Sequence, residues 1–192
     1  MKKVILASAS PRRQELLRQI GIPFEVKVKN VDETVPEGLP FQDAVCELAY
    51  RKAIGIAAFE REGIVIGADT VVVHRGLILG KPAGISDAVQ TLRNLSGSDH
   101  QVITGFCVIE AATGKVVKAS ETTRVFFRRL TDSEIQAYVS SGEPMDKAGS
   151  YGIQGLGAVL VDHIRGCYFN VVGLPLSKLA WVLKEFGVEV LK

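Results

Sequence analysis

The chain has little cysteine, almost no excess charge and no long apolar run, and each shortage excludes a class of protein. Its three cysteines, Cys46, Cys107 and Cys167, lie far apart without a Cys-x-x-Cys spacing, which argues against a disulfide framework and a zinc site. The formal net charge is only +2 and the basic residues are scattered, so neither a nucleic-acid surface nor a polybasic membrane anchor is indicated. No apolar run approaches the roughly 20 residues of a membrane span. The apolar run at 4–7 is also too short for a signal peptide. We therefore expect a cytoplasmic protein whose partner is a small molecule, with no nucleic-acid or membrane partner.

The length of 192 residues and the 47% hydrophobic content suffice for one well-packed domain. No repeat and no linker-like segment divides the sequence, so we expect a single domain over 1–192, either compact or bilobed with a cleft. Strand patterns alternate with helical ones, which predicts an α/β protein with a mixed sheet. The expected strands are 3–7, 24–28, 64–73, 77–79, 101–110, 116–128 and 158–164, and the expected helices are 11–20, 42–61, 87–95, 131–140 and one after 175.

The segment 8–13, Ser-Ala-Ser-Pro-Arg-Arg, lies where a strand pattern ends and a helical pattern begins. Ser10 suits the N-cap and Pro11 the first helical position, so backbone N–H groups and the positive end of the helix dipole would face an anion. Arg12 and Arg13 gain nothing there for helix stability, but their planar guanidinium groups match phosphate oxygens. The segment predicts a phosphate site. The alternative is an ordinary capped helix with solvated arginines.

Asp69 interrupts the β-branched run 64–73. A buried carboxylate is costly without a partner, so Asp69 is expected to hold a cation, pair with a base or act in catalysis. The hydroxyl of the adjacent Thr70 would orient a ligand. The alternative is a structural aspartate that accepts backbone N–H groups in a β-bulge.

Two further segments, 80–82 and 146–155, combine polar side chains with proline, which restricts the backbone, or with glycine, which makes it more flexible. Lys81 lies in a Gly-Lys-Pro turn directly after a strand pattern and is either a phosphate ligand or simply exposed. In 146–155, Asp-Lys-Ala-Gly-Ser-Tyr-Gly-Ile-Gln-Gly, the glycines permit close approach of a ligand. The Gln154 amide offers a donor and an acceptor that match the imide N–H and carbonyl of uracil or thymine. The alternative is a glycine-rich turn without chemistry.

The three histidines do not suggest a metal site. His74, His100 and His163 lack the helical or Cys/His spacing that would assemble one. We expect them to be structural.

Five motifs are spread along nearly the whole chain, at 8–13, 67–72, 80–82, 104–105 and 146–155. Together and in this order they resemble the motifs of the Maf-type nucleoside triphosphate pyrophosphatases. The resemblance implies an elongated, strongly bent mixed sheet flanked by helices, with a central cleft, similar to the inosine-triphosphate pyrophosphatases. It also implies a divalent cation, Mg²⁺ or Mn²⁺, and a homodimer. The ending Tyr-Gly-Ile-Gln-Gly resembles the branch that hydrolyses dTTP and UTP to the monophosphate and pyrophosphate, and modified pyrimidine nucleotides would use the same residues.

Matching these motifs residue by residue assigns expected roles. The resemblance implies that Asp69 is the proton acceptor and that Arg12, Thr70 and Gln154 select the substrate. Glu33, Lys52 and Lys81 align with polar positions of the family cleft. We expect Glu33 and Asp69 to hold the cation, and phosphate oxygens to be bound by Arg12, Arg13, Lys52 and Lys81 with added hydroxyl contacts from Ser8 and Ser10.

Two other functions remain open at the level of sequence. A pyrophosphatase acting on methylated GTP, or on many nucleotides, would keep the same phosphate chemistry and change only the base pocket. A nucleotide-binding regulator of cell division and septum formation is the non-enzymatic alternative. A regulator has no need for a buried aspartate beside a phosphate site, and Asp69 therefore favours the enzyme.

Overall fold

The computed structural model describes residues 2–35 and 38–191, and the chain divides into two compact units. Unit 1 comprises Met1–Thr70, Thr104–Glu121 and Gly173–Lys192, and unit 2 comprises Val71–Ile103 and Thr122–Val172. The polar composition of 30–40 predicts a loop, of which residues 36 and 37 lie outside the described residues. The single domain over 1–192 and its central cleft stay predictions.

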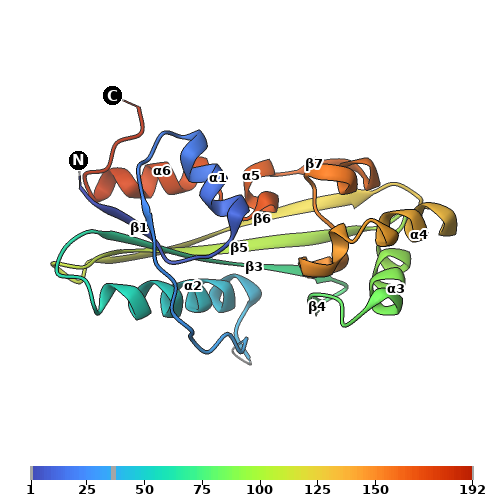
Figure 1. The fold of residues 1–192 in the computed structure, drawn as a ribbon, viewed down its shortest axis with the longest axis horizontal. Helices are drawn as coiled ribbons and strands as arrows, with labels where there is room; N and C mark the ends of the chain where they lie inside the picture. The colour runs from blue at the N-terminus through green and yellow to red at the C-terminus, as the bar shows by residue number, and fades with distance from the viewer. Residues whose placement is uncertain (1, 36–37, 192) are drawn as a thin grey trace. The chain divides into compact units, whose positions relative to one another are not determined.

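One mixed sheet of seven strands is the framework of the fold (Figure 1). Its order is β2-β1-β3-β5-β6-β7, and β4 pairs with β3. Strand β1 runs parallel to β2 and β3, whereas the pairs β3–β4 and β6–β7 are antiparallel, which confirms the predicted mixed sheet. The strands are β1 (Val4–Leu6), β2 (Glu25–Val26), β3 (Ile64–His74), β4 (Leu77–Leu79), β5 (Asp99–Glu110), β6 (Val116–Phe127) and β7 (Val161–Arg165).

The five predicted helices are all present, joined by short ones that the sequence pattern does not reveal. The α-helices are α1 (Pro11–Gln19), α2 (Phe41–Ala57), α3 (Ile85–Leu95), α4 (Asp132–Ser140), α5 (Tyr168–Val172) and α6 (Leu176–Glu185). Three 3₁₀ helices, η1 (Glu143–Asp146), η2 (Ala148–Ser150) and η3 (Gly155–Leu160), follow α4. The strand predicted at 158–164 was wrong at its start, because 158–160 belong to η3. Across the described residues, no helix has the length and apolar character needed to cross a membrane.

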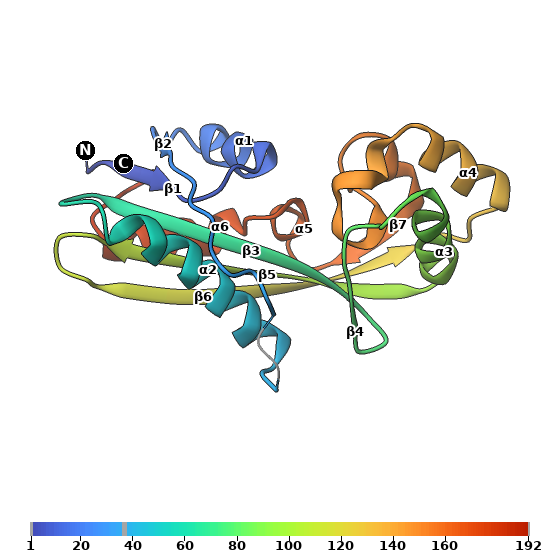
Figure 2. The same ribbon diagram turned by 60° about the horizontal axis from the view of Figure 1, so that its bottom comes forward.

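In unit 1, α2 covers one face of the sheet, and α1 and α6 cover the other (Figures 1 and 2). Helix α2 lies directly against β3 and β5 because each of these strands has a glycine at its contact with the helix. A Cβ added to Gly67 on β3 would lie 2.2 Å from the carbonyl oxygen of Ala49, and one added to Gly105 on β5 would lie 2.5 Å from the carbonyl carbon of Val45. This approach brings side chains on α2 within reach of polar groups on β3.

Unit 2 has a core of its own. Helices α3 and α4 pack around Val125 and Phe127 of β6, with Tyr151 and Leu160 from the segment after α4 in the same cluster. The η2 turn lies so close to β3 that a Cβ added to Gly149 would be 3.0 Å from a methyl carbon of Val72. The η2 part of the 146–155 motif is therefore seated on the sheet, whereas Gln154 near its end is exposed.

Candidate functional site

The first turn of α1 is held by a serine two residues before its N-cap. Ser10 occupies the N-cap and Pro11 the first helical position, as predicted, but the Ser10 side chain makes no capping hydrogen bond. Instead the buried Ser8 hydroxyl accepts from the backbone N–H of Ser10 at 3.3 Å. The prediction that Ser10 is the N-cap and Pro11 the first helical residue is therefore confirmed, and the hydroxyl that bonds to the backbone there is that of Ser8.

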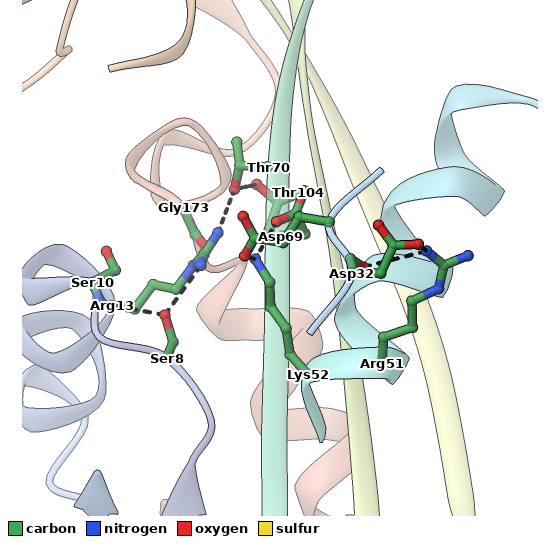
Figure 3. Close-up of polar contacts among 11 residues, drawn as sticks. Ser8, Ser10, Arg13, Asp32, Arg51, Lys52, Asp69, Thr70, Thr104 and Gly173 are labelled. Carbon is green, nitrogen blue, oxygen red and sulfur yellow. Dashed lines mark hydrogen bonds and ion pairs between the residues drawn. The ribbon is translucent and has the colours of Figure 1, made fainter. Parts of the chain in front are cut away.

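Arg13 is fixed by three protein acceptors rather than solvated (Figure 3). Its Nε donates to the carbonyl oxygen of Gly173 at 2.9 Å, Nη1 to the Ser8 hydroxyl at 3.2 Å and Nη2 to the Thr70 hydroxyl at 3.0 Å. Burial lowers the pKa of Arg13, an effect that the nearby Asp69 charge opposes, and an arginine remains charged in proteins even so. The alternative of a solvated arginine therefore does not hold for Arg13. Arg12, on the same turn, is half-buried.

The contact with Arg13 extends to a second threonine. The hydroxyl oxygens of Thr70 and Thr104 share a hydrogen bond at 2.9 Å, and Thr104 is fully buried. Thr104 on β5 belongs to the motif at 104–105 and Thr70 to the motif at 67–72, so two of the sequence motifs meet through these hydroxyls. The structural role of Thr104 was not foreseen, although a polar residue inside an apolar strand is a signal for such a contact.

Asp69, Lys52 and Glu33 form a compact charged cluster. The Lys52 ammonium lies 2.6 Å from Oδ1 of Asp69 and 2.8 Å from Oε1 of Glu33. The side chains of Lys52 and Asp69 are only 15% and 17% exposed, whereas Glu33 is 66% exposed. Of the possibilities open for Asp69, the structure shows pairing with a base, and partial burial makes this pair less screened by salt than a surface pair.

Arg51, which is not among the residues predicted for the site, holds the acidic segment 32–34 beside α2. Its Nη1 donates to the carbonyl oxygens of Asp32 and Thr34, each at 3.3 Å. Asp32 also accepts the backbone N–H of Thr34 at 2.9 Å. The hydrogen bonds from Thr34 lower the pKa of Asp32, and the Arg51 charge adds to this effect. Arg51 therefore fixes the backbone around Glu33, while the next residue, Lys52, pairs with the Glu33 side chain.

The oxygens of Asp69 and Glu33 converge on one positive charge, which in this structure is the ammonium of Lys52. Carboxylate oxygens are the protein ligands that Mg²⁺ uses, with water and substrate phosphates completing the shell. In residues 2–35 and 38–191, no group of three or more His, Cys, Asp or Glu side chains is placed to hold a metal ion. The donor chemistry of Asp69 and Glu33 fits a hard cation held by two protein carboxylates and by its substrate.

The two remaining predicted residues, Lys81 and Gln154, belong to unit 2 and are both exposed. The backbone N–H of Gly149 donates to the carbonyl oxygen of Gly80 at 3.0 Å, which joins the turn carrying Lys81 to the segment carrying Gln154. Ser8, Ser10, Arg12, Arg13, Glu33, Lys52, Asp69 and Thr70 all belong to unit 1. The functional roles of both sets stay predictions.

Comparison with known proteins first places the fold. The structure of a HAM1 protein from Coxiella burnetii matches with a TM-score of 0.51 and 19% sequence identity, covering 96% of this chain and 100% of that one. Identity at this level shows the fold alone, an open mixed sheet flanked by helices. The chain belongs to the Maf-like protein family, whose sequence pattern matches residues 3–186. The predicted family is thereby confirmed.

Relatives of known name match over the whole chain. A protein from Desulforamulus reducens named dTTP/UTP pyrophosphatase is 53% identical, covering 99% of this chain and 100% of its own length. A protein of the same name from Pelotomaculum thermopropionicum is 51% identical and covers 100% of both chains. A third, from Acetivibrio thermocellus, is 51% identical over 100% of this chain.

Proposed function

We propose that the protein is a nucleoside triphosphate pyrophosphatase that hydrolyses dTTP and UTP to the nucleoside monophosphate and pyrophosphate, and that it accepts modified pyrimidine nucleotides. The observation that carries the proposal is the cluster of Asp69, Lys52 and Glu33 in the same unit as the fixed guanidinium of Arg13. It combines a carboxylate that can accept a proton with cationic groups that can bind phosphate. The names and the 51–53% identities of the full-length relatives support the choice of substrate.

The reaction requires neutralisation of a roughly tetra-anionic triphosphate and stabilisation of the leaving pyrophosphate. Arg13 is suited to this because its three protein contacts fix the guanidinium plane before substrate arrives, which reduces the entropy lost on binding. Lys52 is suited because its ammonium can exchange a carboxylate partner for a phosphate oxygen. In this proposal the phosphate oxygens are bound by Arg12, Arg13, Lys52 and Lys81, with hydroxyl contacts from Ser8 and Ser10.

Asp69 acts on water. Its carboxylate orients a water molecule toward the α-phosphorus and accepts the proton that the water loses. The new bond joins the water oxygen to the α-phosphorus, the bond between that phosphorus and the bridging oxygen breaks, and the pyrophosphate leaves with the bridging oxygen. Thr70 and Gln154 contribute to selection of the substrate, the latter through its amide on the pyrimidine edge.

The proposal includes a divalent cation, Mg²⁺ or Mn²⁺, held by Asp69 and Glu33. Such a cation supplies charge neutralisation at the phosphate oxygens. Lys52, which bridges the two carboxylates in this structure, would then turn toward the phosphates. We also propose a cytoplasmic homodimer without nucleic-acid or membrane partners. Static light scattering would test the predicted dimer mass.

The first experiment measures which product is released. The purified protein is incubated with Mg²⁺ or Mn²⁺ and a panel of canonical and modified nucleoside triphosphates, and pyrophosphate is measured against orthophosphate. Pyrophosphate from dTTP and UTP is the expected result. Pyrophosphate mainly from methylated GTP or other purine nucleotides would keep the chemistry but overturn the substrate. Nucleotide binding without any turnover would favour the regulator of cell division.

The variant Asp69→Asn tests the assigned chemistry. We expect turnover to fall by about 10²-fold to 10⁴-fold, the usual contribution of a general base, while nucleotide binding measured by calorimetry is largely kept. Asp43→Asn, an exposed aspartate in the first turn of α2, is the matched control and should retain full activity. Equal loss of binding and turnover in Asp69→Asn would make Asp69 a binding or structural residue.

A further inference from the structure

Glu143, a residue with no role in the proposed chemistry, binds the backbone of the loop that carries Gln154. Its Oε1 accepts the N–H of Gly157 at 2.9 Å, and its Oε2 accepts the N–H of Leu156 at 2.9 Å. Both donors lie in the first turn of η3, immediately after Gln154, which is the N-cap of that helix. The Glu143 carboxylate therefore caps η3 in place of the Gln154 side chain, which makes no capping bond.

Tyr138 of α4 extends this support to the other side of Gln154. Its hydroxyl donates to Oε1 of Glu143 at 2.9 Å and accepts the N–H of Gly152 at 3.1 Å. Backbone groups before and after Gln154 are thus bound to two linked side chains from outside the loop. We call the Glu143 and Tyr138 side chains with their bonds to the loop 152–157 the loop clamp.

The glycines of the loop allow the clamp to close. Gly155 has a φ of +68°, and a Cβ added there would lie 2.7 Å from Oε2 of Glu143. A Cβ added to Gly157 would lie 2.1 Å from the carbonyl oxygen of Gly152 and 2.7 Å from the Tyr138 hydroxyl oxygen. Close approach of a ligand was predicted for the glycines of 146–155, whereas in the structure Gly155, together with Gly157 beyond that segment, is required by close approach of the clamp.

The hydrogen bonds of the loop clamp require an ionised Glu143 that accepts and a protonated Tyr138 that donates, and the pKa shifts of both groups favour these states. Burial alone would raise the pKa of Glu143, but the N–H groups of Gly157 and Leu156 and the Tyr138 hydroxyl outweigh it, so the pKa lies below its ordinary value. Burial raises the pKa of Tyr138, which keeps its proton for donation. The hydrogen bonds to Glu143 are therefore charge-assisted, the stronger class.

The η1 turn that carries Glu143 is also held in place. The Lys147 ammonium donates to the carbonyl oxygen of Glu143 and to Oδ1 of Asp146, each at 2.6 Å. Lys147 thereby ties down the η1 turn from which the Glu143 side chain extends. Gln154, by contrast, is exposed, so its position is set by the backbone rather than by packing of its own side chain.

We propose that Glu143 is a specificity-determining positioning residue, which holds Gln154 in the orientation that reads a pyrimidine base. This inference rests on the proposed function, in which the Gln154 amide recognises that base. Recognition by a matched donor and acceptor discriminates only when both are held in register with the base edge. Release of the loop lets Gln154 adopt other orientations, which weakens pyrimidine binding and leaves the residues that contact phosphate in place.

The test compares Glu143→Ala and Tyr138→Phe with Glu134→Ala. Glu134 is a matched control because its carboxylate also accepts a backbone N–H in unit 2, from Thr131, but it does not belong to the loop clamp. We expect Glu143→Ala to lower the ratio of kcat/KM for dTTP to that for dGTP by about tenfold, mostly through a higher KM for dTTP. Tyr138→Phe should lower the ratio less, because the carboxylate keeps its bonds to Leu156 and Gly157. Glu134→Ala should leave the ratio unchanged.

The conservative variant Glu143→Gln and amide hydrogen exchange complete the test. Glutamine retains one acceptor oxygen, so Glu143→Gln should recover part of the ratio, and exchange at Leu156 and Gly157 should quicken in the order wild type, Glu143→Gln, Glu143→Ala. Faster exchange with an unchanged substrate ratio would overturn the positioning role and leave the proposed function standing. A wild-type protein that releases no pyrophosphate from dTTP or UTP would overturn the proposed function itself, and this inference with it.

Discussion

The charged cluster of unit 1 and the loop clamp of unit 2 are organised in opposite ways. In the charged cluster the side chains bind one another across elements, as Lys52 of α2 does with Asp69 of β3 at 2.6 Å. In unit 2 the Glu143 carboxylate binds backbone N–H groups of one short loop. The first arrangement fixes the positions of charges, and the second fixes the shape of a loop.

This difference predicts which kind of substitution should damage each unit most. The charges of unit 1 are placed by the spacing between α2 and the sheet, so they depend on the glycines that allow close packing. The loop of unit 2 depends on a few hydrogen bonds that the linked side chains of Glu143 and Tyr138 supply. A change in packing should therefore damage unit 1 most, whereas loss of one carboxylate should act locally in unit 2.

The largest expected loss of stability comes from Gly67→Ala. The new methyl group would lie 2.2 Å from the carbonyl oxygen of Ala49 and 2.8 Å from the backbone nitrogen of Ala53, so α2 must move away from β3. We expect a loss of about 3 kcal/mol in the free energy of unfolding, measured by urea denaturation. Turnover should fall as well, because Lys52 moves with α2.

Gly84→Ala is the control for that change. A Cβ at Gly84 meets nothing within 4 Å, and the φ of 176° is extended backbone that alanine adopts freely. Its cost should stay below about 1 kcal/mol, the scale of a weakened helix N-cap. If Gly67→Ala were as stable and as active as Gly84→Ala, close packing of α2 would not be what places Lys52.

The next largest expected loss of stability occurs in unit 2 at acid pH and involves the buried His100. Its Nε2 contacts the Tyr151 hydroxyl at 2.8 Å, and burial, with a smaller contribution from His74, lowers the pKa of His100 from 6.5 to about 4. The folded protein therefore holds this ring neutral, while the unfolded chain takes up a proton as the pH falls below 6.5. The stability contributed by the neutral ring is complete above pH 6.5 and is lost progressively as the pH falls toward 4.

The pH slope of stability measures this effect. Between pH 7.5 and pH 5 the loss should be about 2 kcal/mol, with a slope that approaches roughly 1.4 kcal/mol for each pH unit below pH 6.5. His100→Phe lowers stability at every pH because the Tyr151 hydroxyl loses its partner, but it should remove the part of the slope that belongs to His100. Urea denaturation at pH 7.5 and pH 5 gives both values. Identical slopes in the two proteins would mean that His100 does not carry the acid sensitivity.

Local patterns predicted much of this molecule, and their limits are physical. The motif at 8–13 predicted the start of α1, and the polar interruption at Asp69 predicted a partnered carboxylate, because each signal lies within a few residues. The contacts of Arg51 with the acidic segment and of Glu143 with η3 were not predicted. Each joins residues that are close only after folding.

The smallest expected loss of stability comes from the capping box at the start of α4. The Thr131 hydroxyl accepts the N–H of Glu134 at 3.3 Å, and the Glu134 carboxylate accepts the N–H of Thr131 at 2.8 Å. Thr131→Ala should cost about 1 kcal/mol in the free energy of unfolding, and Thr131→Ser should recover nearly all of it. Thermal denaturation of the three proteins measures both changes.

This cap sharpens the contrast with the loop clamp. Glu134 and Glu143 both bind backbone N–H groups in unit 2, but Glu134 is bonded at the start of a regular helix, whereas Glu143 holds the loop that presents Gln154. Thr131→Ala should therefore lower stability without altering the preference for dTTP over dGTP. A shift in that preference on loss of the α4 cap would show that any weakening of unit 2 disturbs Gln154, and the distinction between support of a helix and support of the loop would no longer hold.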